Sequence, residues 1–294
     1  MQFTKLKNEL FLSFAMCVFG MLNLNAQNWE SSNQSVLQAI NDGEYHTALQ
    51  EAISARELAE KEFSFKHPNY ICSLHNLASV HHKLGQVDAS RSLYLQSIKT
   101  AAAYLGKEDP IFAIGLYRLA DLYQENGNKE KALPMYEKAL GILNNTYGKN
   151  HPHTIACANN IGTLYHKMGD QLKAEEYLIN TLRLRENNKE ISINDYATSL
   201  NDLANLYKDT WRYEEAEKLY KKGLKVRSEN SGKFHPGYAE TLNGLGNLFE
   251  LQKQYEEAEI LYREALMIKE KKLGRHHPSY LKSIDDLVQL AKTK

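Results

Sequence analysis

Two side chains near the middle of the chain have the types and the spacing of a catalytic pair. His153 and Cys157 are four residues apart, so on a helix they share a face, where an imidazole can serve as the base for a thiol nucleophile. The number of histidines also raises the possibility of a metal site. The histidines in question are His67, His151, His235 and His277. The sequence contains no glycine-rich phosphate loop, nucleophile elbow or paired-carboxylate motif.

The elements that must position these side chains follow a repeat of 42 residues. Position 1 of the repeat is Pro68, Pro110, Pro152, Asn194, Pro236 and Pro278. Position 10 is apolar in each of these repeats, and position 23 is small: Ala48, Ser90, Ala132, Ala174, Ala216 and Ala258. A fixed period of this size indicates a solenoid, which buries its core between neighbouring repeats and can grow as one body.

Each repeat predicts two helices. The first begins with proline at position 1 and has apolar residues at positions 7, 10, 11, 13 and 14, and a glycine at position 18 ends it. The second has small or apolar residues at positions 23, 26, 27, 30 and 31. Trp211 and Lys253 replace the glycine at position 18, so those turns either bend differently or accept a strain of about 1 to 2 kcal/mol. The segment from Asn187 to Asn194 is the expected irregular joint.

The fold class predicted is therefore all-α, an α-α superhelix of about six helix pairs plus a C-terminal capping helix. Residues 27–67 form a degenerate N-terminal capping repeat whose first helix is short, around Val36 to Ile40. Residues 68–277 form five full repeats, and residues 278–294 form the closing helix.

Residues 1–26 have the pattern of a signal peptide: Lys5 and Lys7, an apolar run from 10 to 22, and the exit Leu24-Asn25-Ala26. The run is shorter than the ~20 residues that span a bilayer, which disfavours a permanent anchor. A lipoprotein signal at Cys17 is the other alternative, disfavoured by the bulky residue before it. We expect export to the periplasm or beyond the cell, with a mature chain that starts at Gln27.

Composition excludes several classes of protein. The chain has 36 basic and 36 acidic residues and is 43% apolar, which does not suggest disorder, nucleic-acid binding or a strongly charged partner. After signal cleavage, Cys72 and Cys157 remain. They lie two repeats apart, farther than the ~7 Å Cα limit of a disulfide, so we expect two free thiols.

The repeat also reinterprets the candidate chemistry. Cys157 occupies position 6, which is always small, so a close helix contact explains it without catalysis. The linker histidines recur along the solenoid and cannot converge on one ion, so no metal and no cofactor is expected. Tyrosines at positions 14 and 27 read as core residues. Accordingly, Tyr207→Ala or Tyr220→Ala should destabilise the fold by ~3 to 5 kcal/mol, and Tyr117→Ala, at position 8, by far less.

The pattern L-x-x-L-A-x-L-Y, G-x-Y-x-E-A-E-x-L-Y, then A-L-x-I resembles the tetratricopeptide repeat, and its length and the linker L-G-x-x-H-P resemble the kinesin-light-chain variety. It recurs in Asn201 to Tyr220 and Asn243 to Tyr262. The resemblance implies a right-handed superhelix whose first helices line the concave side. It also implies that asparagines at matching positions hold cargo peptides.

Positions 8, 9 and 12 lie off the apolar face of the first helix and hold many asparagines, whose amides both donate and accept hydrogen bonds. They predict a polar ladder for an extended peptide, with drift on a solvated surface as the alternative. The predicted binding residues are His75, Asn76, Tyr117, Arg118, Asn159, Asn160, Asn201, Asp202, Asn205, Asn243 and Asn247.

The favoured function is a non-enzymatic exported scaffold that binds a peptide segment or partner protein along the concave groove. A structural or regulatory subunit of an envelope assembly, acting through the convex face or the ends, is the alternative. An enzyme is a remote third possibility. No nucleic-acid partner and no membrane insertion after signal cleavage are expected.

Overall fold

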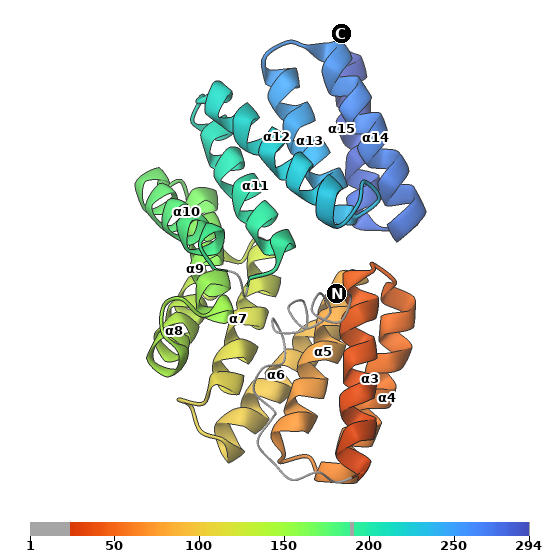
Figure 1. Ribbon diagram of the computed structural model, residues 1–294, viewed down its shortest axis with the longest axis vertical. Coiled ribbons are helices and arrows are strands. Elements are labelled where there is room, and N and C mark those ends of the chain that lie inside the picture. The colour runs from red at the N-terminus through yellow and green to blue at the C-terminus, as the bar shows by residue number, and fades with distance from the viewer. Residues whose placement is uncertain (1–23, 189–190, 294) are drawn as a thin grey trace. The chain divides into compact units, whose positions relative to one another are not determined.

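The computed structural model describes residues 24–188 and 191–293, and every regular element within these ranges is an α-helix (Figure 1). The helices are α3 (Leu24–Asn41), α4 (Tyr45–Phe63), α5 (Pro68–Lys83), α6 (Val87–Tyr104), α7 (Pro110–Glu125), α8 (Lys129–Tyr147), α9 (Pro152–Met168), α10 (Gln171–Glu186), α11 (Ile193–Asp209), α12 (Tyr213–Asn230), α13 (Pro236–Leu251), α14 (Tyr255–Leu273) and α15 (Pro278–Thr293). The expected helix pairs and the closing helix are therefore present.

In the five repeats that begin with proline, the residue before that proline caps the first helix. The Nδ1 atom of His67 accepts a hydrogen bond from the backbone N–H of Asn69 at 3.2 Å, and Asp109 accepts one from Ile111 at 2.7 Å. Such a side chain satisfies a backbone donor that a helix start leaves without a partner. His151, His235 and His277 make the same contact. The linker histidines thus have a structural role that the sequence analysis did not recognise.

The turns between paired helices keep one conformation even where glycine is absent. Gly85 and Gly127 have φ values of 74° and 78°. Trp211 and Lys253, at the same repeat position, have φ values of 60° and 63°. The left-handed turn is therefore retained, and these two residues accept its strain.

One helix differs from the prediction, and one joint is capped differently from the other linkers. The first helix of the N-terminal repeat is not short: α3 has 18 residues. The joint after α10 lies partly outside the described residues; α10 ends at Glu186 and α11 begins at Ile193, one residue before position 1. Ser192 caps α11 by accepting from the backbone N–H of Asn194 at 3.1 Å. A hydroxyl here replaces the histidine or aspartate of other linkers.

The predicted apolar run of the signal peptide, residues 10–22, lies outside the described residues. In the part of the chain that the structure describes, none of the helices combines the length and the apolar character needed to span a bilayer.

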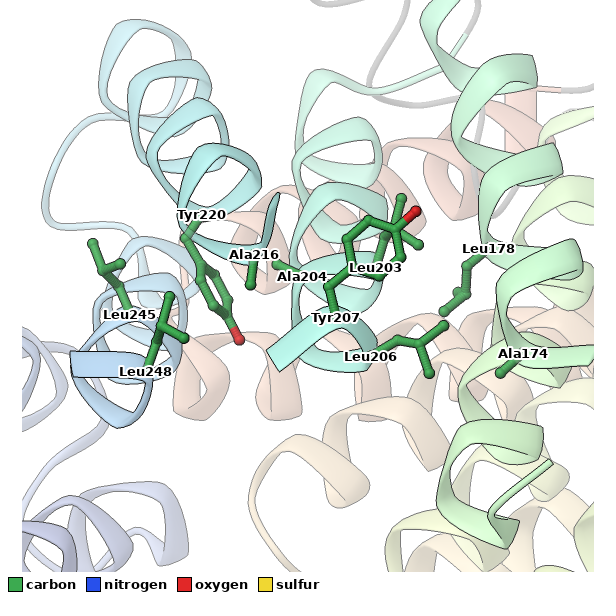
Figure 2. Packing of buried hydrophobic residues seen from close by; sticks show 10 residues of the cluster. All are labelled: Ala174, Leu178, Leu203, Ala204, Leu206, Tyr207, Ala216, Tyr220, Leu245 and Leu248. Atoms are coloured by element: carbon green, nitrogen blue, oxygen red, sulfur yellow. The ribbon is translucent and has the colours of Figure 1, made fainter. Parts of the chain in front are cut away.

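The contacts group the chain into two compact units, one up to Leu164 and one from Tyr165 to Lys294, with the boundary inside α9. We call them unit 1 and unit 2. In each, a helix pair packs on the next pair. The core of unit 2 shows the principle (Figure 2): Tyr220 of α12 lies against Leu245 and Leu248 of α13, while Tyr207 and Leu206 of α11 face Leu178 of α10.

The core residues predicted at positions 23 and 27 are confirmed, whereas at position 14 Tyr207 is buried and Tyr123 and Tyr165 are only half-buried. The small residues at position 23 have 0% exposure. The tyrosines at position 27, namely Tyr94, Tyr136, Tyr220 and Tyr262, are at most 1% exposed. Because these rings fill the space between successive pairs, truncating one leaves a cavity as well as losing apolar burial.

Candidate partner-binding surface

Position 8 of the first helix is buried, which contradicts the expectation that it lies on an open face. Asn159, Asn201 and Asn243 are 1%, 9% and 8% exposed, and His75 and Tyr117 are 7% and 6% exposed. The premise that Tyr117→Ala costs far less than Tyr207→Ala is therefore wrong, since Tyr207 is 8% exposed.

In unit 2, the buried asparagines tie one repeat to the next. The Nδ2 atom of Asn201 donates to Oγ1 of Thr241, and that of Asn243 donates to Oγ of Ser283, both at 2.9 Å. Thr241 and Ser283 both occupy position 6 of the following repeat. Position 8 thus packs on position 6 of its neighbour.

Unit 1 makes the same contact with different chemistry. A side-chain carbon on Gly115, at position 6, would lie 2.9 Å from Nε2 of His75, at position 8 of the preceding repeat. Glycine therefore makes room for an imidazole where a threonine or serine meets an asparagine in unit 2. Burial, with a smaller contribution from Arg118, lowers the pKa of His75 to about 3, so the ring is neutral.

The solvent-facing part of the first helix is a narrow band at positions 5, 9, 12 and 16, which we call the exposed stripe. These positions are spaced by four, three and four residues, as one helical face requires. In unit 1 the stripe contains Cys72, Asn76, Ser79, Lys83, Ile114, Arg118, Asp121, Glu125, Ala156, Asn160 and Thr163. In unit 2 it contains Lys167, Thr198, Asp202, Asn205, Asp209, Glu240, Gly244, Asn247, Leu251, Lys282, Asp286 and Gln289.

The predicted binding residues at positions 9 and 12 fall on this stripe. In unit 1, Arg118 is half-buried, and Asn160 donates to Oδ1 of Asp121 at 2.5 Å. The same carboxylate oxygen accepts from the hydroxyl of Tyr136 at 2.5 Å. Asn76 is the exception, because it is 8% exposed and donates to Asn33 at 2.6 Å. The stripe of unit 1 is therefore already organised by internal hydrogen bonds.

Unit 2 holds its stripe in a related way. Asn205 accepts from the hydroxyl of Tyr220 at 2.6 Å, and Asn247 donates to the backbone oxygen of Asn243 at 2.7 Å. Asp202 is half-buried. When positions 5 and 16 are included, acidic side chains outnumber basic ones on this stripe. The acidic residues are Asp202, Asp209, Glu240 and Asp286, and the basic residues are Lys167 and Lys282.

A set of buried cations beneath the stripe of unit 2 was missed by the sequence analysis. Arg185, Arg227 and Lys269 occupy position 34 and are 6%, 3% and 3% exposed. Arg185 donates to Oγ of Ser199 at 2.6 Å, and Lys269 to Oγ of Ser283 at 2.7 Å. Burial lowers the pKa of Arg227 and of Lys269, while nearby Glu240 opposes both shifts. Their recurrence every 42 residues was the available signal.

The candidate catalytic pair lacks the electrostatics of a nucleophile and its base. Burial raises the pKa of the Cys157 thiol well above its usual value, and the thiol donates to the backbone oxygen of Tyr136 at 3.4 Å. Burial also lowers the pKa of His153 to about 3. Cys157 is thus a protonated core residue, and Cys72, also a free thiol, is half-buried. Within the described ranges, no group of three or more histidine, cysteine or acidic side chains could hold a metal.

A model of the tetratricopeptide repeat matches residues 35–105, 112–187 and 195–271, well over half of the chain. The chain belongs to the tetratricopeptide-repeat family. No curated protein matches it. Similar solved structures include the kinesin light chain nearly identical TPR-like repeats of Podosopora anserina, with 21% identity, a TM-score of 0.52, and coverage of 72% of this chain and 99% of that one.

Two structures of complexes resemble a larger share of the chain. Rap protein complexed with Competence and Sporulation Factor has 16% identity and a TM-score of 0.64, covering 92% of this chain and 76% of that one. NprR in complex with its cognate peptide NprX has 16% identity and a TM-score of 0.64, with 90% and 76% covered. At these identities the likeness shows the fold alone, an all-α superhelical repeat, and confirms the predicted fold class.

Proposed function

We propose that this protein is a non-enzymatic scaffold that binds a peptide segment of a partner protein along the exposed stripe of its first helices. The observation that carries the proposal is the contrast within each helix. Most of its circumference is buried by neighbouring helices, whereas positions 5, 9, 12 and 16 leave side chains of mixed polarity in reach of solvent. Of the structures with a similar fold, NprR was solved with its cognate peptide NprX bound, and Rap with Competence and Sporulation Factor bound.

The stripe suits an extended peptide because its amides and charged groups recur along each unit. Arg118 in unit 1 can donate to a backbone carbonyl, and Asn247 in unit 2 can both donate and accept. The acidic excess on the unit 2 stripe favours a segment that carries basic side chains there. Its affinity should decline as salt screens these charges. The position 8 asparagines support this surface from beneath.

The second part of the proposal is that the scaffold acts after export. It is supported by the pattern of residues 1–26, with two lysines, an apolar run and the exit at Ala26. Intact-mass analysis of the protein recovered from its native cell tests it. A mature chain that begins at Gln27 is expected, and a membrane-held chain that keeps residues 1–26 would contradict it.

A displayed library of random peptides, selected on the purified chain, tests the binding surface. Selected peptides are then measured against a stripe variant with Arg118→Gln, Glu240→Gln and Asn247→Ala. We expect their affinity to fall at least tenfold, because the variant removes charge and amide contacts without emptying the core.

A matched control likewise changes one basic residue, one glutamate and one asparagine, at exposed positions of the second helices: Lys99→Gln, Glu137→Gln and Asn180→Ala. It should bind the selected peptides like the unchanged chain, and both variants should retain the melting temperature. Peptides that bind the stripe variant with unchanged affinity would exclude this surface. Sensitivity to the control variant instead would support the alternative convex-face scaffold.

A further inference from the structure

The last helix leaves a cavity that earlier repeats fill with a ring. A pocket of about 240 Å³ lies between α14 and α15, lined by Glu259, Arg263, Leu287, Leu290 and Ala291. It is larger than the ~150 Å³ apolar cavity that holds benzene in an engineered protein. Ala291 is at position 14, where the preceding repeats have His81, Tyr123, Tyr165, Tyr207 and Phe249. The pocket therefore has the place of a missing aromatic side chain.

Tyr207, two repeats earlier, shows how such a ring is held. The guanidinium of Arg212 lies 3.7 Å from the centre of the Tyr207 ring and donates at 2.6 Å to Glu175, which is at position 24 of the preceding repeat. Glu259 is the position 24 residue beside the pocket, and it pairs with Arg263 at 2.6 Å. The pocket thus continues the interface between repeats and adds a carboxylate acceptor and a guanidinium that can lie over a ring.

Unit 2 also has a large aromatic side chain that is exposed to solvent. Trp211 is 79% exposed in the turn after α11, where the four preceding repeats have glycine. Lys253 follows at this position in the next repeat, so the turn itself does not require an indole. An exposed lysine is ordinary, whereas a large apolar ring left in water is a typical anchor of protein contacts.

Both features lie on one edge of unit 2. Successive first helices run parallel, so the turn after α11, the turn after α13 and the end of α15 share an edge (Figure 1). Leu251, the last residue of α13, is 54% exposed and belongs to the repeat between them. The edge therefore presents a ring, an apolar centre and a ring-sized pocket in order.

We propose that this edge joins two copies of the chain, with Trp211 of each copy seated in the pocket of the other. A two-fold axis near Leu251 would satisfy both contacts at once and close the assembly as a dimer. The indole N–H would donate to Glu259, the carboxylate beside the pocket. The apolar walls formed by Leu287 and Leu290 would exclude water from the ring.

Sedimentation equilibrium and acrylamide quenching of tryptophan fluorescence over a protein concentration series test this. Trp29 is 2% exposed, so changes in quenching report on Trp211. The unchanged chain should form dimers as its concentration rises, with Trp211 becoming protected. Trp211→Ala and Ala291→Tyr, which fills the pocket with the ring of earlier repeats, should each remain monomeric. Ile260→Ala, at a residue 65% exposed on α14, is the matched control and should dimerise normally.

A mixture of the two variants gives the decisive result. The Trp211→Ala chain keeps the pocket, and the Ala291→Tyr chain keeps the indole, so together they can form one of the two contacts. The mixture should associate, more weakly than the unchanged chain, with the remaining Trp211 protected. A monomeric unchanged chain, a dimer that survives both substitutions, or a mixture that stays monomeric would each overturn the proposal. Cooperative melting of each variant shows that it is folded, and Ala291→Phe replaces Ala291→Tyr if needed.

Discussion

Units 1 and 2 use the same repeat pattern but fill position 34 of the second helix differently. In unit 1 this position holds Ala59, Ala101 and Leu143, each 0% exposed. In unit 2 it holds Arg185, Arg227 and Lys269, which are almost as deeply buried. One backbone arrangement thus accommodates an apolar contact and a buried cation at equivalent places.

In two repeats of unit 2, the residue at position 5 interacts with the cation at position 34. Ile114 stands in the repeat of Leu143, whereas Thr198 stands in the repeat of Arg227 and accepts from its Nη2 atom at 3.0 Å. Glu240 stands in the repeat of Lys269 and favours its charged form. A buried cation is tolerated only with hydrogen-bonding partners around it. The comparison therefore indicates that the local partners, and not the helix pair, decide which residue is acceptable.

The largest effect is expected when a cation is placed at position 34 of unit 1. Leu143→Arg should destabilise the fold by about 3 to 5 kcal/mol, the cost of an uncompensated buried charge, because Ile114 offers no acceptor. Urea unfolding measures the free energy. The reverse change, Arg227→Leu, should be close to neutral, since an apolar side chain can replace a paired ion. Equal losses for both substitutions would show that position 34 has one requirement throughout.

The pH dependence of stability should also differ between the two units. His75 and His153 in unit 1 have pKa values of about 3 because they are buried, against about 6.5 when unfolded. Below pH 6.5 the unfolded chain binds protons that the folded chain does not, so stability is complete above 6.5 and declines towards pH 3. Asp121, whose pKa burial raises, acts in the opposite direction.

The measurement is therefore a difference between two chains. His75→Asn and His153→Asn introduce residues that occupy the same positions in other repeats, Asn201 and Asn69. Melting temperatures of the double variant should fall less steeply between pH 6.5 and 3 than those of the unchanged chain. In unit 2, burial lowers the pKa of His166, but Asp209 opposes the shift. A His166→Asn variant should therefore flatten the profile less. Parallel profiles for all three chains would contradict the assignment.

The tyrosine hydroxyls sharpen the comparison on a smaller scale. Tyr136 donates to the carboxylate of Asp121, whereas Tyr220 donates to the neutral amide of Asn205. Hydrogen bonds to charged groups contribute about 1.5 to 3 kcal/mol and neutral ones about 0.5 to 1.5. Tyr136→Phe should therefore destabilise more than Tyr220→Phe in urea unfolding. Leu178, which stands at this position in the intervening repeat, shows that the fold accepts a residue without a hydroxyl.

Much of this organisation could be predicted by comparing the residues that occupy the same position in successive repeats. The helices, the small residues at position 23 and the core tyrosines at position 27 follow from side-chain size and helical spacing, which one sequence displays six times over. The exposure of position 8 could not be read in this way. Adjacent residues on a helix differ by about 100°, and each first helix packs on its own partner and on both neighbouring repeats. A repeat position that holds polar residues, such as Asn201 and Asn243, can therefore face a neighbouring repeat instead of solvent.

The burial of the cations at position 34 could not be predicted from the sequence for a related reason. Arg227 lies in the last turn of α12, and Lys269 lies just before the last turn of α14. Near this end of a helix, basic residues interact favourably with the helix dipole and are usually solvated. Only the three-dimensional packing shows that Ser283 and Thr198 receive them. To predict which residue a polar side chain contacts, one must know which part of the neighbouring repeat covers it. The sequence pattern alone does not contain that information.

The smallest expected effect concerns a contact that both units share. His82 lies 2.8 Å from Glu125 in unit 1, and His166 lies 3.0 Å from Asp209 in unit 2. Each joins the end of one first helix to the next, but the carboxylates are 60% and 49% exposed, so water screens the interaction. Glu125→Gln and Asp209→Asn should each cost less than about 1 kcal/mol at pH 7. Thermal unfolding at low and high salt measures both. Losses well above this, or a loss confined to one unit, would show that these contacts do more than align neighbouring repeats, and that the two units differ at their surface as well as at position 34.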